Sequence, residues 1–84
     1  MAVDTRSRLV NTAFSRVLRD TRIERGLTQL ELAERSRVSR ENVVRMEGAK
    51  RAPTLAMMFK LCDAMQVDPV EFIKAVADRR EGTE

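Results

Sequence analysis

The chain has 84 residues, 43% of them hydrophobic, and a formal net charge of +3, which suits one small folded domain rather than a disordered tail or a membrane protein. It contains no histidine, tyrosine or tryptophan, so most side chains that enzymes use for acid–base catalysis are missing and a zinc ion would lack its usual nitrogen ligand. The single cysteine, Cys62, cannot form a disulfide within the chain.

Apolar residues spaced by three and four positions predict an all-α protein of five short helices. The first helix is expected to run from about Thr5 to Arg25 and to end at Gly26, because glycine adopts the left-handed conformation at a helix end with little strain. Its buried face is predicted to comprise Val10, Phe14, Val17, Leu18 and Thr21.

Two short helices joined by a brief turn are predicted next. Thr28 and Glu31 fit a capping box, in which each side chain accepts a hydrogen bond from a backbone N–H at the helix start. This second helix is expected to end near Arg35, and Ser39 is a suitable N-cap for a third helix that runs to about Met46. The residues expected to face inward are Leu32, Ala33, Val43 and Met46.

A basic loop from Gly48 to Pro53 and two further helices complete the prediction. Thr54 is expected to cap a fourth helix, and Asp68, Pro69 and Glu71 are typical of the start of a fifth. The apolar residues of the fourth helix are Leu55, Met58, Leu61, Cys62 and Met65. We therefore expect a single domain over residues 1–84, with its core at about 9–77 and a frayed tail at 79–84.

Basic charge is concentrated in the first two thirds of the chain. Residues 1–26 carry six arginines against three acidic residues, residues 27–53 carry six cations against four, and residues 54–84 have a net charge of −2. Most of the cations are arginines, which bind phosphate groups and guanine edges through two parallel hydrogen bonds. On charge alone, nucleic-acid binding and an ordinary solvated helical surface are equally compatible with this distribution.

The segment from Gly26 to Glu47 resembles the helix-turn-helix of phage repressor and Cro proteins and of the xenobiotic-response-element family of bacterial regulators. The resembling runs are GLTQLELAER (26–35), VSR (38–40) and RME (45–47). The flanking runs PTL (53–55) and LCDAMQV (61–67) are similar to the family's fourth helix and following turn. The resemblance covers roughly residues 13–74 and implies a compact five-helix, lambda-repressor-like DNA-binding domain, with the helix-turn-helix at its second and third helices.

The resemblance also implies roles for particular residues. Gln29 matches a glutamine that commonly contacts a DNA phosphate, beside a helix N-terminus that itself attracts anions. Arg22 and Glu47 match positions that form a partly buried ion pair between the first and third helices. Ala33 matches a position that must be small for the second and third helices, which form the motif, to pack closely.

Two positions depart from the family pattern. Arg37 occupies a turn position that is usually glycine, so it either adopts a positive φ or shifts the turn. The family's Gly-Lys after the third helix is here Gly48-Ala49-Lys50, with the glycine one position early. Both departures concern loop geometry rather than the fold.

The third helix is the expected recognition helix, with its N-terminal half in the major groove. With Val43 inward, Glu41 and Arg45 point outward; Arg45 is expected to read guanine, and an alternative is an ordinary surface ion pair with Glu41. Lys50 and Arg51 are expected to contact phosphates. The complete set of expected DNA-binding residues is Thr28, Gln29, Arg37, Ser39, Arg40, Glu41, Asn42, Val44, Arg45, Lys50 and Arg51.

A homodimer is expected, because one helix-turn-helix reads too few base pairs to select an operator, whereas two copies about one helical turn apart suffice. The fifth helix is more apolar than its own core requires. It is expected to supply the interface with Val70, Phe72, Ile73 and Val76, although these side chains also suit the monomer core.

The sequence therefore predicts a sequence-specific regulator of transcription, in the first instance a repressor that binds an inverted-repeat operator in double-stranded DNA. Phage repressors and restriction–modification controller proteins both fit this description. The alternative is the DNA-binding antitoxin of a toxin–antitoxin pair, in which another surface binds a toxin. No enzymatic activity, cofactor, metal or membrane partner is expected, and the absence of an apolar leader predicts a cytoplasmic protein.

Overall fold

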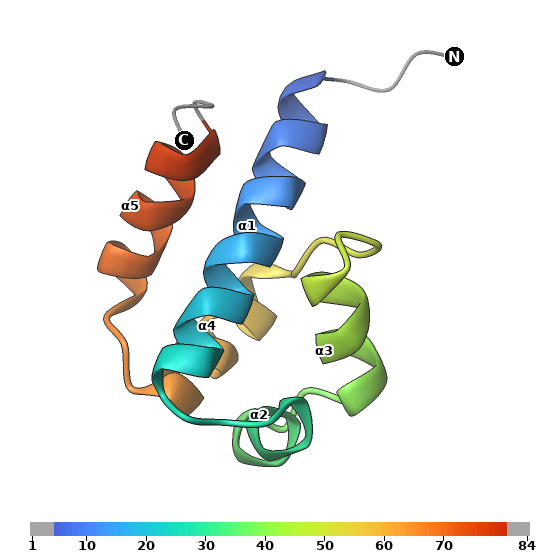
Figure 1. The fold of residues 1–84 in the computed structure, drawn as a ribbon, viewed down its shortest axis with the longest axis vertical. Coiled ribbons are helices and arrows are strands. Elements are labelled where there is room, and N and C mark those ends of the chain that lie inside the picture. Colours follow the sequence, from blue (N-terminus) through green and yellow to red (C-terminus); the bar gives the residue numbers. More distant parts are fainter. Residues whose placement is uncertain (1–4, 81–84) are drawn as a thin grey trace.

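The longest helix, α1 (Thr5–Glu24), forms the centre of the computed structural model, which describes residues 5–80 (Figure 1). Helices α2 (Gln29–Ser36) and α3 (Arg40–Glu47) pack together, and α3 also contacts α1. Helix α4 (Leu55–Met65) packs on α2, while α5 (Pro69–Arg80) lies along α1 on the side opposite α3 (Figure 1). Among the described residues there are no strands, so the predicted all-α, five-helix fold is confirmed.

The core is formed where the five helices converge. Leu18, Leu32, Val43 and Leu61 have no exposed surface, and Phe14 of α1 meets Phe72 of α5 edge to face with ring centroids 5.9 Å apart. This contact joins the first and last helices. The other buried apolar residues are Ala13, Val17, Leu27, Ala33, Val38, Met46, Met58, Cys62, Met65 and Val76.

Two residues of the predicted buried face of α1 are not fully buried: Val10 is exposed and Thr21 is half-buried. Val10 is 40% exposed, and residues 5–9 before it are exposed as well. The first turns of α1 extend beyond the end of α5 (Figure 1), so the apolar periodicity of α1 continues further toward its N-terminus than the packing of the helices does.

The helix starts follow the predicted caps. The hydroxyls of Thr28, Ser39 and Thr54 each accept a hydrogen bond from the backbone N–H three residues later, and the Asp68 carboxylate accepts one from Val70 N–H. At Thr28 the box is complete, because Glu31 also accepts from the Thr28 N–H at 2.9 Å.

Left-handed residues end four of the helices. Gly26 closes α1 with φ 72°, and Arg37, Ala49 and Gln66 have φ of 62°, 58° and 59° after α2, α3 and α4. The N–H groups of Lys50 and Ala49 donate to the carbonyls of Arg45 and Met46, which makes Ala49 the turning residue of a Schellman motif. Because the glycine, Gly48, comes one position earlier than in the family pattern, Ala49 occupies the left-handed position that glycine would adopt with less strain.

The end of the chain is more ordered than expected at two residues. The frayed tail was predicted over 79–84, but α5 continues to Arg80, and the Arg79 guanidinium donates to the Asp20 carboxylate of α1 at 2.9 Å. Residues 81–84 lie outside the described part of the chain. No helix within residues 5–80 combines the length and apolar character needed to cross a membrane.

Candidate nucleic-acid interface

The turn between α2 and α3 presents α3 at the surface. Arg37 adopts the left-handed conformation, the first of the two outcomes predicted for it, and its N–H donates to the Ala33 carbonyl at 2.9 Å. The buried Ser36 hydroxyl accepts from Val38 N–H, which fixes the turn from inside. Ala33 and Val38 are buried, so the two helices pack closely as the family resemblance implied.

Arg22, Glu47 and Gln29 form a hydrogen-bonded network beneath the start of α2. Arg22 binds the Glu47 carboxylate through Nε at 2.6 Å and Nη2 at 3.0 Å, and its Nη1 donates to the Leu27 carbonyl at 2.8 Å. The side chains of Arg22 and Glu47 are only 12% and 6% exposed. Hydrogen bonding to Glu47 raises the pKa of Arg22 above its ordinary value. The ion pair implied by the resemblance is thus present, tying α1 to the end of α3.

Gln29 is the third member of this network. Its Nε2 donates to Glu47 Oε1 at 3.1 Å, and the side chain is half-buried. One Nε2 proton and the amide oxygen remain for another partner. The amide is therefore held in one place at the first turn of α2, where a phosphate contact was predicted.

The capping box beside Gln29 also shifts the pKa of Glu31. The hydrogen bond from the Thr28 N–H lowers the pKa of the Glu31 carboxyl. The carboxylate thus stays ionised near the positive end of the helix. Thr28 itself is exposed, with its hydroxyl oxygen engaged by Glu31 N–H at 3.0 Å.

The outer face of α3 is open to solvent. Arg40, Glu41, Val44 and Arg45 line one shallow groove of about 400 Å³. Arg45 Nη2 donates to Glu41 Oε2 at 2.7 Å, with both side chains more than half exposed. Asn42 lies at the edge of this face and is half-buried, while Ser39 is exposed at the tip and caps the helix. The face thus combines cationic, anionic and apolar side chains.

The loop after α3 adds two exposed cations. The backbone N–H of Lys50 donates to the Arg45 carbonyl at 2.8 Å, which fixes the backbone at Lys50, and its side chain is exposed. Arg51 Nη2 lies 3.6 Å from the Met57 sulfur, which leaves most of the guanidinium free to bind. The loop that carries Lys50 and Arg51 directly follows α3 in the chain.

The predicted interface residues of α5 separate into two pairs. Val70 and Ile73 are exposed, at 71% and 46%, whereas Phe72 and Val76 are buried at 4% and 8%. This corrects the prediction for Phe72 and Val76, because their side chains pack inside the monomer and are not available to a second chain. Phe59 on the neighbouring helix α4 is 45% exposed.

Arg19 of α1 is a residue that the sequence prediction missed. It lines a cleft of about 400 Å³ together with Arg22, Gln29, Val44 and Glu47. Its spacing of three from Arg22 was the available signal, because residues three apart share a helix face. Arg19 precedes the helix-turn-helix motif, and its position beside Gln29 depends on how α1 packs against α2 and α3.

Cys62 lies in the core and not on the surface that carries the candidate DNA contacts. Cys62 has no exposed surface, and burial raises the pKa of its thiol to about 11, with Asp63 and Asp68 adding to the effect. Within residues 5–80, no group of three or more cysteine or acidic side chains is arranged to hold a metal ion.

Two adjoining short helices, a fixed turn and a second helix whose outer face, with Arg40 and Arg45, is open to solvent define a helix-turn-helix DNA-binding protein of the lambda-repressor-like fold. The chain matches the family described as Helix-turn-helix (HTH_3) over residues 18–72, and it belongs to that family.

Similar proteins are found among both sequences and structures. The chain is 33% identical over 76 residues, or 90% of its length and 94% of the relative's, to the "Uncharacterized HTH-type transcriptional regulator y4dJ" of Sinorhizobium fredii. The restriction-modification controller protein C.AhdI from Aeromonas hydrophila is 32% identical with a TM-score of 0.71, covering 74% of this chain and 94% of that one. The controller protein C.Esp1396I, as a tetramer in complex with its natural 35 base-pair operator, shares the fold at a TM-score of 0.79 and 24% identity, covering 86% and 95%.

Proposed function

We propose that the chain is a transcriptional repressor that binds an inverted-repeat operator as a homodimer, with α3 in the major groove. The observation that best supports this proposal is the set of side chains on the outer face of α3. This face presents Arg40, Glu41, Val44 and Arg45 together, while Val43 and Met46 are buried in the core and Glu47 is paired with Arg22 at the end of the helix. A rigid helix with mixed polar and apolar side chains on its open face suits direct reading of base edges.

The side chains on α3 divide into chemical roles. Arg45 donates to guanine O6 and N7, and Glu41, one turn earlier, both orients Arg45 and accepts from a cytosine N4. Val44 contacts a thymine methyl group, and Arg40 at the helix tip reads guanine or binds phosphate. Asn42, which is half-buried at the edge of this face, reads an adenine.

Phosphate contacts surround this face. Gln29 uses its remaining Nε2 proton at the start of α2, and Thr28, Arg37 and Ser39 lie at the adjoining helix ends. Lys50 and Arg51 follow α3 and bind the backbone on its other side. These contacts fix register and orientation and do not specify sequence.

The dimer uses Val70 and Ile73 of α5, with Phe59 of α4 beside them, as its exposed apolar surface. Relatives support a regulator of this kind. The Sinorhizobium relative is named a transcriptional regulator and C.AhdI a controller protein, and C.Esp1396I assembles as a tetramer on its operator. The protein acts as a single domain in the cytoplasm, where its DNA is accessible.

Selection of bound duplexes from a random DNA library tests the proposal. We expect enrichment of an inverted repeat with half-sites about one helical turn apart. Arg45→Ala should relax the preference at one base pair per half-site and weaken binding by about 10- to 100-fold. Arg35→Ala, which removes an exposed arginine at the end of α2, is the control and should leave the selected sequence unchanged.

No enrichment, with only salt-sensitive general binding, would reject sequence-specific regulation. Insolubility of the isolated chain together with co-purification of a toxin would favour the antitoxin alternative instead.

A further inference from the structure

A polar cleft lies where α1, the start of α2 and the end of α3 meet. It has a volume of about 400 Å³ and is lined by Arg19, Arg22, Gln29, Val44, Glu47 and Gly48. Val44 also belongs to the open face of α3, so the cleft adjoins the surface that carries the proposed base contacts. It therefore lies between the recognition helix and the body of the domain.

The hydrogen-bond donors in this cleft exceed its acceptors. The Glu47 carboxylate is engaged by two hydrogen bonds from Arg22 and one from Gln29, which offset its charge. Arg22 and Gln29 each retain unused N–H donors. Arg19 is exposed, and within residues 5–80 its side chain makes no hydrogen bond or ion pair, so its full positive charge and five donors remain available.

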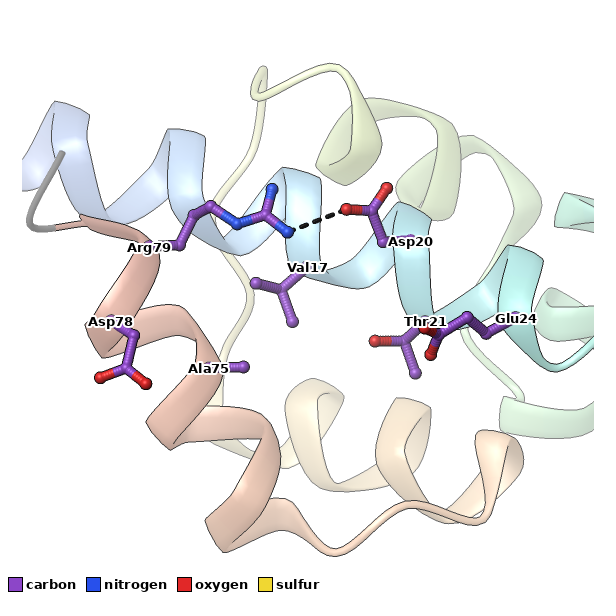
Figure 2. Close-up of a pocket in the computed structure, with 7 residues that line it drawn as sticks. All are labelled: Val17, Asp20, Thr21, Glu24, Ala75, Asp78 and Arg79. Atoms are coloured by element: carbon purple, nitrogen blue, oxygen red, sulfur yellow. Dashed lines mark hydrogen bonds and ion pairs between the residues drawn. The ribbon is translucent and has the colours of Figure 1, made fainter. Parts of the chain in front are cut away.

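Four charged residues near the C-terminal end of α1 are divided between its two sides. Arg19 and Arg22 line the cleft beside α3, whereas Asp20 and Glu24 line a groove of about 490 Å³ against α5 (Figure 2). In that groove Asp20 is paired with Arg79 across the two helices. The side of α1 toward the recognition helix is thus cationic and the side toward α5 is acidic, which is the polarity expected if an anion approaches on the α3 side.

We propose that Arg19 is an additional DNA contact, which binds a backbone phosphodiester at the mouth of this cleft, next to Gln29, while α3 occupies the major groove. The inference rests on the proposed function. It extends the phosphate contacts beyond the helix-turn-helix to α1, with Arg19 and Gln29 on the same side of α3. A phosphate contact of this kind adds affinity for any sequence and leaves the choice of sequence to α3.

The salt dependence of DNA binding tests the contact. Binding of the selected operator and of a scrambled duplex is measured from low to high salt for the wild type, Arg19→Gln, Arg19→Lys and Lys74→Gln. Lys74→Gln is the charge-matched control, because Lys74 is exposed on α5, which packs on α1 and α4.

We expect Arg19→Gln to weaken binding to both duplexes by about three- to tenfold and to reduce the slope of log K against log salt by about 0.9 for each bound copy. Arg19→Lys should retain the slope, and Lys74→Gln should leave it unchanged. Equal effects of Arg19→Gln and Lys74→Gln, with normal wild-type binding, would overturn the Arg19 contact alone. Failure of the wild type to bind either duplex would overturn the proposed function as well.

Neutral methylphosphonate linkages, introduced one at a time into the operator, distinguish a backbone phosphate from a free anion. At one position per half-site the substitution should weaken the wild type and have no further effect on Arg19→Gln. Strictly additive losses at every position would overturn the proposal. Inorganic phosphate at equal ionic strength should compete no better than chloride, and selective competition by phosphate would instead assign the cleft to a free anion.

Discussion

Gln29 at the start of α2 and Glu47 at the end of α3 are joined by a hydrogen bond of 3.1 Å, although they lie 18 residues apart in the sequence. Glu47 also carries the ion pair with Arg22, so one carboxylate connects α1, α2 and α3. The angle between the two motif helices is therefore set partly by a single buried charge.

Removal of that charge by Glu47→Gln should lower the free energy of unfolding by about 2–4 kcal/mol, because it leaves the largely buried Arg22 without its counter-charge. Urea denaturation measures the loss. Glu41→Gln breaks the exposed Glu41–Arg45 pair and is the control, with an expected loss below about 1 kcal/mol. Equal losses in the two variants would contradict the structural role assigned to Glu47.

Ala49 offers a stabilising substitution. It has φ 58° at the end of α3, a conformation that costs an L-residue more than glycine, so Ala49→Gly should stabilise the protein by about 0.5–1 kcal/mol. Thermal unfolding of Ala49→Gly and Ala52→Gly compares the same change three residues apart. Ala52 is not among the residues with positive φ, and glycine there should destabilise slightly through the entropy of the unfolded chain. A lower midpoint for Ala49→Gly would refute the strain argument.

Local features of the structure could be predicted because they depend on neighbouring residues. The capping box of Thr28 and Glu31, the turn at Gly26 and the inward positions of Val43 and Met46 all follow from short spacings. The Arg22–Glu47 pair came from a family resemblance and not from spacing, since 25 residues separate the two side chains.

Features that depend on packing between helices could not be predicted in the same way. The apolar pattern of α5 does not distinguish Phe72, which meets Phe14, from Ile73, which stays exposed, because which side of the helix meets α1 is decided by tertiary packing. Arg19 was missed for the same reason. Its position beside Gln29 exists only once α1 lies across the motif.

Cys62 should be chemically inert in the folded protein. Its thiol is fully buried with a pKa raised to about 11, so reaction with a disulfide reagent at pH 8 should require unfolding and accelerate strongly in urea. Because the folded pKa lies above the unfolded value of about 8.5, the associated stability is present below pH 8.5 and is lost as pH rises through about 11. Cys62→Ala should lack this component of the alkaline loss. Rapid labelling without denaturant would contradict the burial argument.

Ile73 tests the proposed dimer surface. Ile73→Glu places a charge on the exposed apolar part of α5 and should shift the protein from dimer to monomer in sedimentation equilibrium without loss of helix content. Ile23→Glu alters a similarly exposed isoleucine on α1 and should leave the dimer intact. An unchanged mass for Ile73→Glu, or a monomeric wild type, would rule out this interface.

The Glu41–Arg45 pair leads to a prediction about specificity. If Glu41 orients Arg45 and accepts from a cytosine, Glu41→Gln should strengthen binding to scrambled duplex, since a negative charge is removed beside DNA, and should lower the preference for the operator by about tenfold. Competition between the two duplexes measures that preference directly. Glu71→Gln makes the same charge change at an exposed position on α5 and should alter neither value appreciably. If Glu41→Gln instead strengthened binding to both duplexes equally, the pair would be an ordinary surface ion pair, and Arg45 would read its base without help from Glu41.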